Sequence, residues 1–129
     1  MVLVDTSVWI EYLDRVNPLV ENDLENLLRT GQVATAGLVL AELRQGCRRP
    51  DQVRLMIAAL EPLEYLEVDR ASWLRAGELV AERAAKGFTL EVGNSLLAAL
   101  ALRENCEVFT LDRDFEQIPG VKLYRLREN

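Results

Sequence analysis

Acidic side chains follow two short apolar segments of the sequence, at the points where buried strands would end. Asp5 follows residues 1–4 and precedes Thr6 and Ser7, and Asp112 follows residues 107–111. In open α/β sheets, ligands bind beyond the carboxyl ends of the strands, so acids at two strand ends would share one edge. The pair predicts a pocket that holds a divalent cation. For Asp5 alone, helix N-capping is an equally good interpretation.

Three further polar residues are candidates for the same pocket. Glu42 lies in the apolar stretch 38–43, where burying an acid without a partner or a metal would be costly. A simple exposed helix position is its alternative. Asn94 follows Gly93 at a predicted helix start, where N-capping is the alternative. Asp114 is either a further site acid or the cap of a short turn.

Composition excludes several classes of chemistry. The 129-residue chain contains no histidine, which rules out Ser-His-Asp and Cys-His catalysis and the usual zinc sites. Its net charge of −6 argues against broad attraction to nucleic acid but allows a local basic patch or a basic protein partner. Cys47 and Cys106 lack ligand-like spacing and are expected to be reduced core thiols. Carboxylates, hydroxyls or a bound metal must therefore carry any catalysis.

The elements that would position these residues alternate between strands and helices. Strands are predicted over 1–4, 32–36, 63–68, 108–111 and 121–124, and helices over 17–31, 38–45, 51–60, 69–86 and 91–104. This alternation predicts one domain over residues 1–129, an α/β/α three-layer sandwich whose central sheet has about five mostly parallel strands. No apolar run approaches a membrane span, and no signal peptide is recognisable, which predicts a cytoplasmic protein.

Four short motifs, in this order and at these intervals, make the chain resemble a PIN-domain ribonuclease. They are Asp5-Thr6-Ser7, Ala41-Glu42-Leu43, the stretch 94–99 and the stretch 110–115. More narrowly, the chain is similar to the VapC toxins of type II toxin–antitoxin pairs, and the resemblance covers nearly all of it. The resemblance implies a PIN-like fold and endonucleolytic cleavage of RNA that depends on Mg²⁺ or Mn²⁺.

The resemblance also implies roles for individual residues. Catalytic roles fall to Asp5, Glu42, Asp112 and position 94, with Asp114 as an accessory, and metal binding falls to Asp5, Asp112 and position 94. Thr6 and Thr110 match hydroxyls that orient these acids or a water. One departure matters: this chain has Asn94 where the family has Asp. An amide oxygen can still face a cation, but one negative charge is lost, so weakened cleavage is expected.

Partners follow from the same resemblance and from the surface residues. A cognate antitoxin, an RNA substrate and a homodimer within a larger toxin–antitoxin complex are expected. Arg44 and Arg113 are candidates for phosphate contacts, whereas Arg48 and Arg49 are better explained as solvated charges at a helix end. An apolar groove that receives an antitoxin helix is one interpretation of Trp9, Tyr12, Leu13, Leu24 and Leu28, and core packing is the other.

Two other functions stay open from sequence alone. The first is a PIN-fold module that binds an antitoxin without catalysis. The second, ranked lower, is a Mg²⁺-dependent phosphoryl-transfer hydrolase that uses Asp5 as a covalent acceptor. That chemistry calls for another acid close to Asp5, and position 7 carries Ser.

Overall fold

The computed structural model describes residues 1–127, in which five strands alternate with six α-helices and one 3₁₀ helix. The strands are β1 (Val2–Val4), β2 (Val33–Ala36), β3 (Glu64–Leu66), β4 (Glu107–Phe109) and β5 (Lys122–Leu123). The helices are α1 (Thr6–Asp14), α2 (Pro18–Arg29), α3 (Gly37–Gly46), α4 (Pro50–Leu60), α5 (Arg70–Ala85), α6 (Val92–Glu104) and the 3₁₀ helix η1 (Arg113–Gln117).

The five strands form one sheet in the order β3-β2-β1-β4-β5, and every neighbouring pair is parallel. All residues of β1 and β2 are buried, whereas the edge strands β3 and β5 carry exposed residues. A parallel sheet is covered on both faces, which explains why its central strands read as continuous apolar runs. The predicted α/β/α sandwich with a mostly parallel sheet is confirmed.

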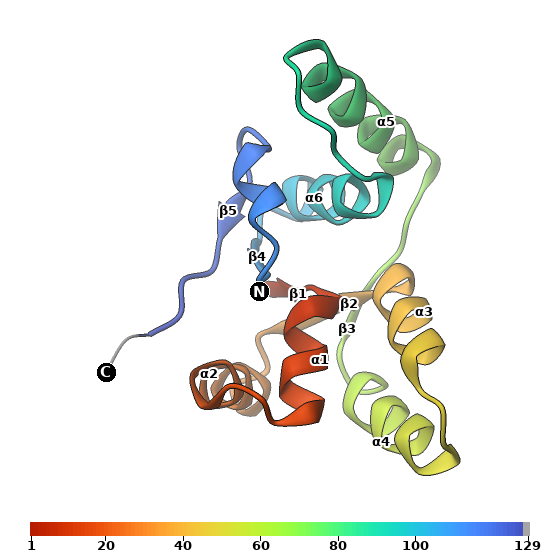
Figure 1. Cartoon of the computed structure of the whole chain (residues 1–129), viewed down its shortest axis with the longest axis vertical. Helices are drawn as coiled ribbons and strands as arrows, with labels where there is room; N and C mark the ends of the chain where they lie inside the picture. Colours follow the sequence, from red (N-terminus) through yellow and green to blue (C-terminus); the bar gives the residue numbers. More distant parts are fainter. Residues whose placement is uncertain (128–129) are drawn as a thin grey trace.

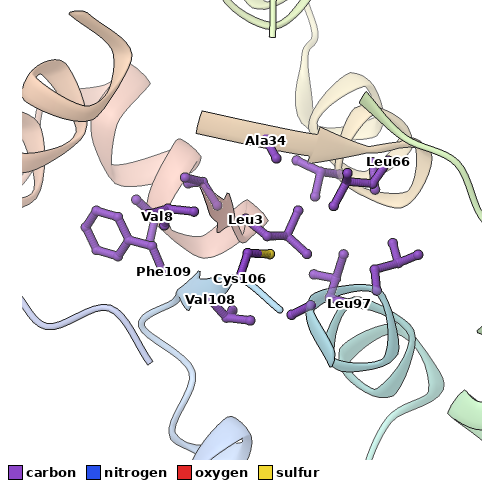
Figure 2. Packing of buried hydrophobic residues seen from close by; sticks show 14 of the residues in the cluster. Leu3, Val8, Ala34, Leu66, Leu97, Cys106, Val108 and Phe109 are labelled. Carbon is purple, nitrogen blue, oxygen red and sulfur yellow. The ribbon is translucent and has the colours of Figure 1, made fainter. Parts of the chain in front are cut away.

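Helices cover the sheet on two sides, as Figure 1 shows: α1 to α4 lie on one side, and α6 with α5 packed against it on the other. The core lies between these layers and the strands. Leu3, Val108 and Phe109 are at most 1 % exposed, and Leu97 of α6 reaches the same interior (Figure 2). Parallel strands of this kind place all their carboxyl ends at one edge, from which α1, α3 and η1 depart.

Two predicted helix starts are confirmed at the level of single hydrogen bonds. The Asn17 side chain accepts a bond from Leu19 N at 3.1 Å, and the Asp69 carboxylate accepts one from Ser72 N at 2.8 Å. The predicted N-capping role of Asn94 is wrong, because α6 is preceded by Glu91 and Asn94 lies inside its first turn. The Asn94 side chain is therefore free to point elsewhere.

The groove predicted on the first two helices is wrong for its largest residues. Trp9 and Leu24 are fully buried, and the Trp9 ring packs edge-to-face on Tyr12 with 5.8 Å between centroids. These side chains hold α1 and α2 to the core, as the alternative interpretation had it. The exposed apolar residues of α1 are instead Ile10 and Leu13. Nowhere in residues 1–127 is a helix long and apolar enough to cross a membrane.

The two cysteines are free thiols with different surroundings. Cys106 is buried, and burial raises the pKa of its thiol. Cys47 is only partly buried, with its sulfur 4.0 Å from that of Met56. The expected core environment is thus found for Cys106 but only in part for Cys47.

Candidate active site

Asp5 joins the end of β1 to the start of α1 and is 6 % exposed. Its backbone N–H donates to Phe109 O at 2.9 Å, which ties it to the end of β4. Carboxylate oxygen Oδ1 accepts from Thr6 N at 2.8 Å and so caps α1. The second oxygen, Oδ2, accepts from Thr110 Oγ1 at 2.8 Å across the strand ends. Asp5 therefore caps a helix with one oxygen and faces the neighbouring strand end with the other.

Asp112 and Asn94 meet through their side chains, although 18 positions separate them in the sequence. Asn94 Nδ2 donates to Asp112 Oδ2 at 3.0 Å. The other oxygen of Asp112 accepts from Asp114 N at 2.9 Å and caps η1. Thr110 Oγ1 accepts from Asp112 N at 3.0 Å while it donates to Asp5. One hydroxyl thus links the two acids that the sequence placed at strand ends.

Glu42 reaches the same edge of the sheet from α3. Its side chain is exposed, so the expected burial of this acid is wrong. It is not a free surface charge either, because its Oε1 accepts from Thr6 Oγ1 at 2.8 Å. Thr6 lies next to Asp5, so this bond connects Glu42 to the other candidates. A hydrogen-bonded series therefore runs from Asn94 through Asp112, Thr110, Asp5 and Thr6 to Glu42.

Ser7 belongs to this network and was missed as a site residue by the sequence. Its hydroxyl donates to Asp5 Oδ2 at 2.9 Å and accepts from Leu111 N at 3.1 Å. The only sequence signal was its place two residues after Asp5, where a hydroxyl is also ordinary at a helix start. Its role depends on residue 111, which the fold brings over from β4.

The remaining sequence candidates lie outside the network. Asp114 is exposed in η1, and only its backbone N–H joins the site, so the capping role proposed for it belongs to Asp112. Arg113 is exposed beside Asp112. Arg44 is exposed on α3, where its Nη1 donates to Cys47 O at 3.4 Å.

The donor set can be tested against a hard divalent cation. Asp5 is almost fully buried, yet no Lys or Arg of residues 1–127 forms a salt bridge with Asp5, Glu42 or Asp112. A buried carboxylate without a cationic partner is unfavourable, and oxygen ligands are those that Mg²⁺ and Mn²⁺ prefer. The chemistry of the donors fits such a cation. The same residues contain no group of three or more His, Cys, Asp or Glu side chains arranged for a metal.

A cavity of about 370 Å³ lies beside Glu42, between α1, α3 and the start of α4. Its lining is mixed: Glu42 and Arg49 are charged, and the exposed Ile10, Leu13 and Leu55 are apolar. Glu42 thus stands between the polar network and an open cavity.

Comparison with known proteins gives consistent matches over nearly the whole chain. A family model described as "PIN domain" matches residues 2–121. The protein named "Ribonuclease VapC21" of Mycobacterium tuberculosis is 30 % identical over 107 residues, which cover 81 % of this chain and 78 % of that protein.

Two solved structures are similar in fold. One is VapBC2 from Rickettsia felis bound to a DNA fragment from its promoter, with 25 % identity, a TM-score of 0.80, and coverage of 96 % of this chain and 98 % of that chain. The other is VapBC-5 from Mycobacterium tuberculosis, described as a member of a family of toxin–antitoxin systems. It has 28 % identity, a TM-score of 0.68, and coverage of 96 % and 97 %.

Proposed function

Because this chain belongs to the PIN domain family, we propose that it is the toxin of a toxin–antitoxin pair and a divalent-metal-dependent endoribonuclease. Relatives named as ribonucleases and a similar structure from a toxin–antitoxin system support this function. The observation that carries it in this chain is the hydrogen-bonded series from Asn94 to Glu42 at the carboxyl edge of the sheet. An enzyme that used Asp5 as a covalent acceptor would have no use for that series.

The proposed roles follow from the position of each side chain in the series. Asp5, Asp112 and the amide oxygen of Asn94 hold the cation, which is Mg²⁺ or Mn²⁺. When bound, the cation lowers the pKa of a coordinated water and stabilises charge on the phosphate. Thr110 and Ser7 fix the orientation of Asp5 through its Oδ2. Glu42 is exposed, and Thr6 bonds only one of its two oxygens, so Oε2 is available to accept a proton from the attacking water.

Asn94 sets the expected strength of metal binding. Its amide N–H satisfies Asp112 at 3.0 Å and brings no charge of its own. With Asn94→Asp, two carboxylates would face each other at this position, and their repulsion would be relieved by a cation. Two unit charges about 4 Å apart interact by about 4 kcal/mol at an effective dielectric constant near 20, so even a quarter of this changes affinity severalfold. We therefore propose that this chain is a weakened nuclease.

The test compares the chain with its Asn94→Asp variant. Cleavage of a labelled RNA in Mg²⁺ or Mn²⁺ is expected to rise by about ten- to a hundredfold in the variant, and manganese affinity measured by calorimetry is expected to rise with it. Asp114→Asn is a matched control, because Asp114 is exposed and its side chain lies outside the network. Equal manganese affinities would remove Asn94 from the metal site, and no cleavage by either protein would favour the non-catalytic binding module.

We also propose that the partner is a cognate antitoxin and that the functional assembly contains a toxin homodimer. Exposed Ile10, Leu13 and Leu55 flank the cavity beside Glu42, and the net charge of −6 suits a basic partner segment. Leu13→Glu is expected to abolish antitoxin binding without unfolding the protein, whereas Leu74→Glu on α5 is its exposed control. Pull-down and light scattering test the two statements separately.

A further inference from the structure

Positive charge gathers at one corner of an otherwise acidic chain. Residues 44–54 contain four arginines and a single acid, Asp51, while the other 118 residues contain eleven basic and twenty acidic side chains. The corner formed by Arg44, Arg48, Arg49 and Arg54, here named the arginine corner, joins the end of α3 to the start of α4. An acidic protein that handles a polyanion needs such a local reversal of charge.

The four arginines line a common cavity of about 390 Å³. Gln52 Oε1 accepts from Arg48 N at 2.9 Å and from Arg49 N at 3.1 Å, which fixes the backbone of the connection between the two helices. The backbone therefore presents these side chains from one preformed turn. The positive end of the α4 dipole lies at the same turn and adds to the potential.

Most of this charge is uncompensated. Arg49 pairs with Asp51 at 3.3 Å, on the surface. In the part of the chain that the structure describes, Arg44, Arg48 and Arg54 form no salt bridge. On α5, by contrast, Arg75 is paired with both Glu78 and Glu82. Three exposed guanidinium groups in one corner are thus available to an anionic ligand.

The arginine corner is continuous with the candidate active site. Its cavity shares Cys47 and Arg49 with the cavity beside Glu42. A strand that passes Glu42 can therefore continue along α3 to the arginines without leaving the hollowed surface.

We propose that the arginine corner binds the phosphate backbone of single-stranded RNA on one side of the bond that is cut, which rests on the proposed ribonuclease function. Guanidinium groups match phosphate oxygens in a bidentate way, and such contacts position a strand without reading its sequence. RNA is favoured over an acidic protein because the same polyanion must also reach Glu42, across a surface that repels it elsewhere.

Binding of a labelled uridine oligomer of about twelve nucleotides, followed by fluorescence anisotropy in EDTA, tests the proposal without any need for cleavage. The triple variant Arg44→Gln, Arg48→Gln and Arg54→Gln is expected to bind about tenfold more weakly. Between about 50 and 200 mM salt, its log–log slope should fall by about 2, since each lost phosphate contact on a single strand removes about 0.7. Replacing the same three residues with Lys should retain most of the slope.

A second triple variant, Arg29→Gln, Arg70→Gln and Arg75→Gln, removes the same charge from exposed positions on α2 and α5 and should change affinity by less than about twofold. Equal losses in the two triple variants would overturn the proposal, as would polyglutamate that binds the corner as tightly as RNA of equal charge. Loss of cleavage with corner-dependent RNA binding intact would overturn the nuclease function alone. Full cleavage with corner-independent binding would overturn the corner alone.

Discussion

Asp5 and Asp23 are buried to almost the same degree, at 6 % and 5 % exposure, and serve different purposes. Neither forms a salt bridge within residues 1–127. Asp23 lies in α2, and its Oδ2 accepts from Tyr124 Oη at 3.1 Å and from Arg127 N at 2.8 Å. Both donors come from the segment after β5, so Asp23 fastens the end of the described chain to α2.

Asp5 differs in what its hydrogen bonds connect. Through Thr110 it is linked to Asp112, and through Thr6 to Glu42, so three acids share one edge of the sheet. Like charges brought together oppose folding, and a structure that keeps them is expected to gain function from them. The comparison teaches that burial of an acid does not distinguish an anchor from an active site. The identity of the groups it is joined to does.

Asp5→Asn gives the largest expected effect and tests the active-site half of the comparison. In the Asn94→Asp background it should lower RNA cleavage by about 10²- to 10³-fold, because one charge of the proposed metal site is removed. Stability should be unchanged or slightly higher. Ser7 and Thr110 can turn their hydroxyls to accept from the new amide, and repulsion among the acids falls.

Cleavage assays and urea unfolding of the same samples measure the two effects. Asp114→Asn serves as the control that also removes one acid near the site. If Asp5→Asn kept its cleavage and lost stability instead, Asp5 would be an anchor of the same kind as Asp23, and the comparison would collapse.

The fold could be predicted from the sequence because its signals are local. Short apolar runs mark the strands, and residues such as Asn17-Pro18 and Asp69 mark helix starts that the structure confirms. The predicted strands run one to three residues longer than those observed; for example, β3 covers only Glu64–Leu66 of the predicted 63–68. Strand ends depend on pairing with neighbours, which a single run of residues does not contain.

The site could be predicted only in part, because its contacts are distant in sequence. Acids after β1 and β4 were visible as residues at strand ends. The bond from Asn94 to Asp112 and the bridge from Ser7 to Leu111 join segments 18 and 104 positions apart. Asp23 carried no signal at all, since an acid in the middle of an amphipathic helix usually faces solvent.

Asp23→Ala gives the second largest effect and tests the anchor half of the comparison. It leaves Tyr124 Oη and Arg127 N without their acceptor, which should lower the free energy of unfolding by about 2 kcal/mol. RNA cleavage per folded molecule should not change. Urea unfolding measures the first effect, and Asp14→Ala, at an exposed position of α1, is the matched control. A cleavage defect without a stability defect would assign Asp23 to function.

Tyr124→Phe gives the smallest effect and isolates one of the two bonds to Asp23. Its loss should cost about 1 kcal/mol at neutral pH, because a partly buried acceptor loses a single neutral donor. The pH dependence sharpens this prediction. Burial, followed by the hydrogen bond to Asp23, raises the pKa of Tyr124 above its usual value of 10.0. The protonated phenol is therefore the form that the folded state favours.

A raised pKa in the folded state means that the contribution of Tyr124 is complete below pH 10 and is lost as the pH rises through the higher, folded value. The stability difference between wild type and Tyr124→Phe should therefore shrink in alkaline solution. Burial also raises the pKa of Tyr12, so wild type and variant share a decline from that residue, and only the difference between them reports on Tyr124. Urea unfolding at neutral pH and at several values above pH 10 measures it. A difference that stays constant with pH would show that Tyr124 packs against the core without depending on its bond to Asp23.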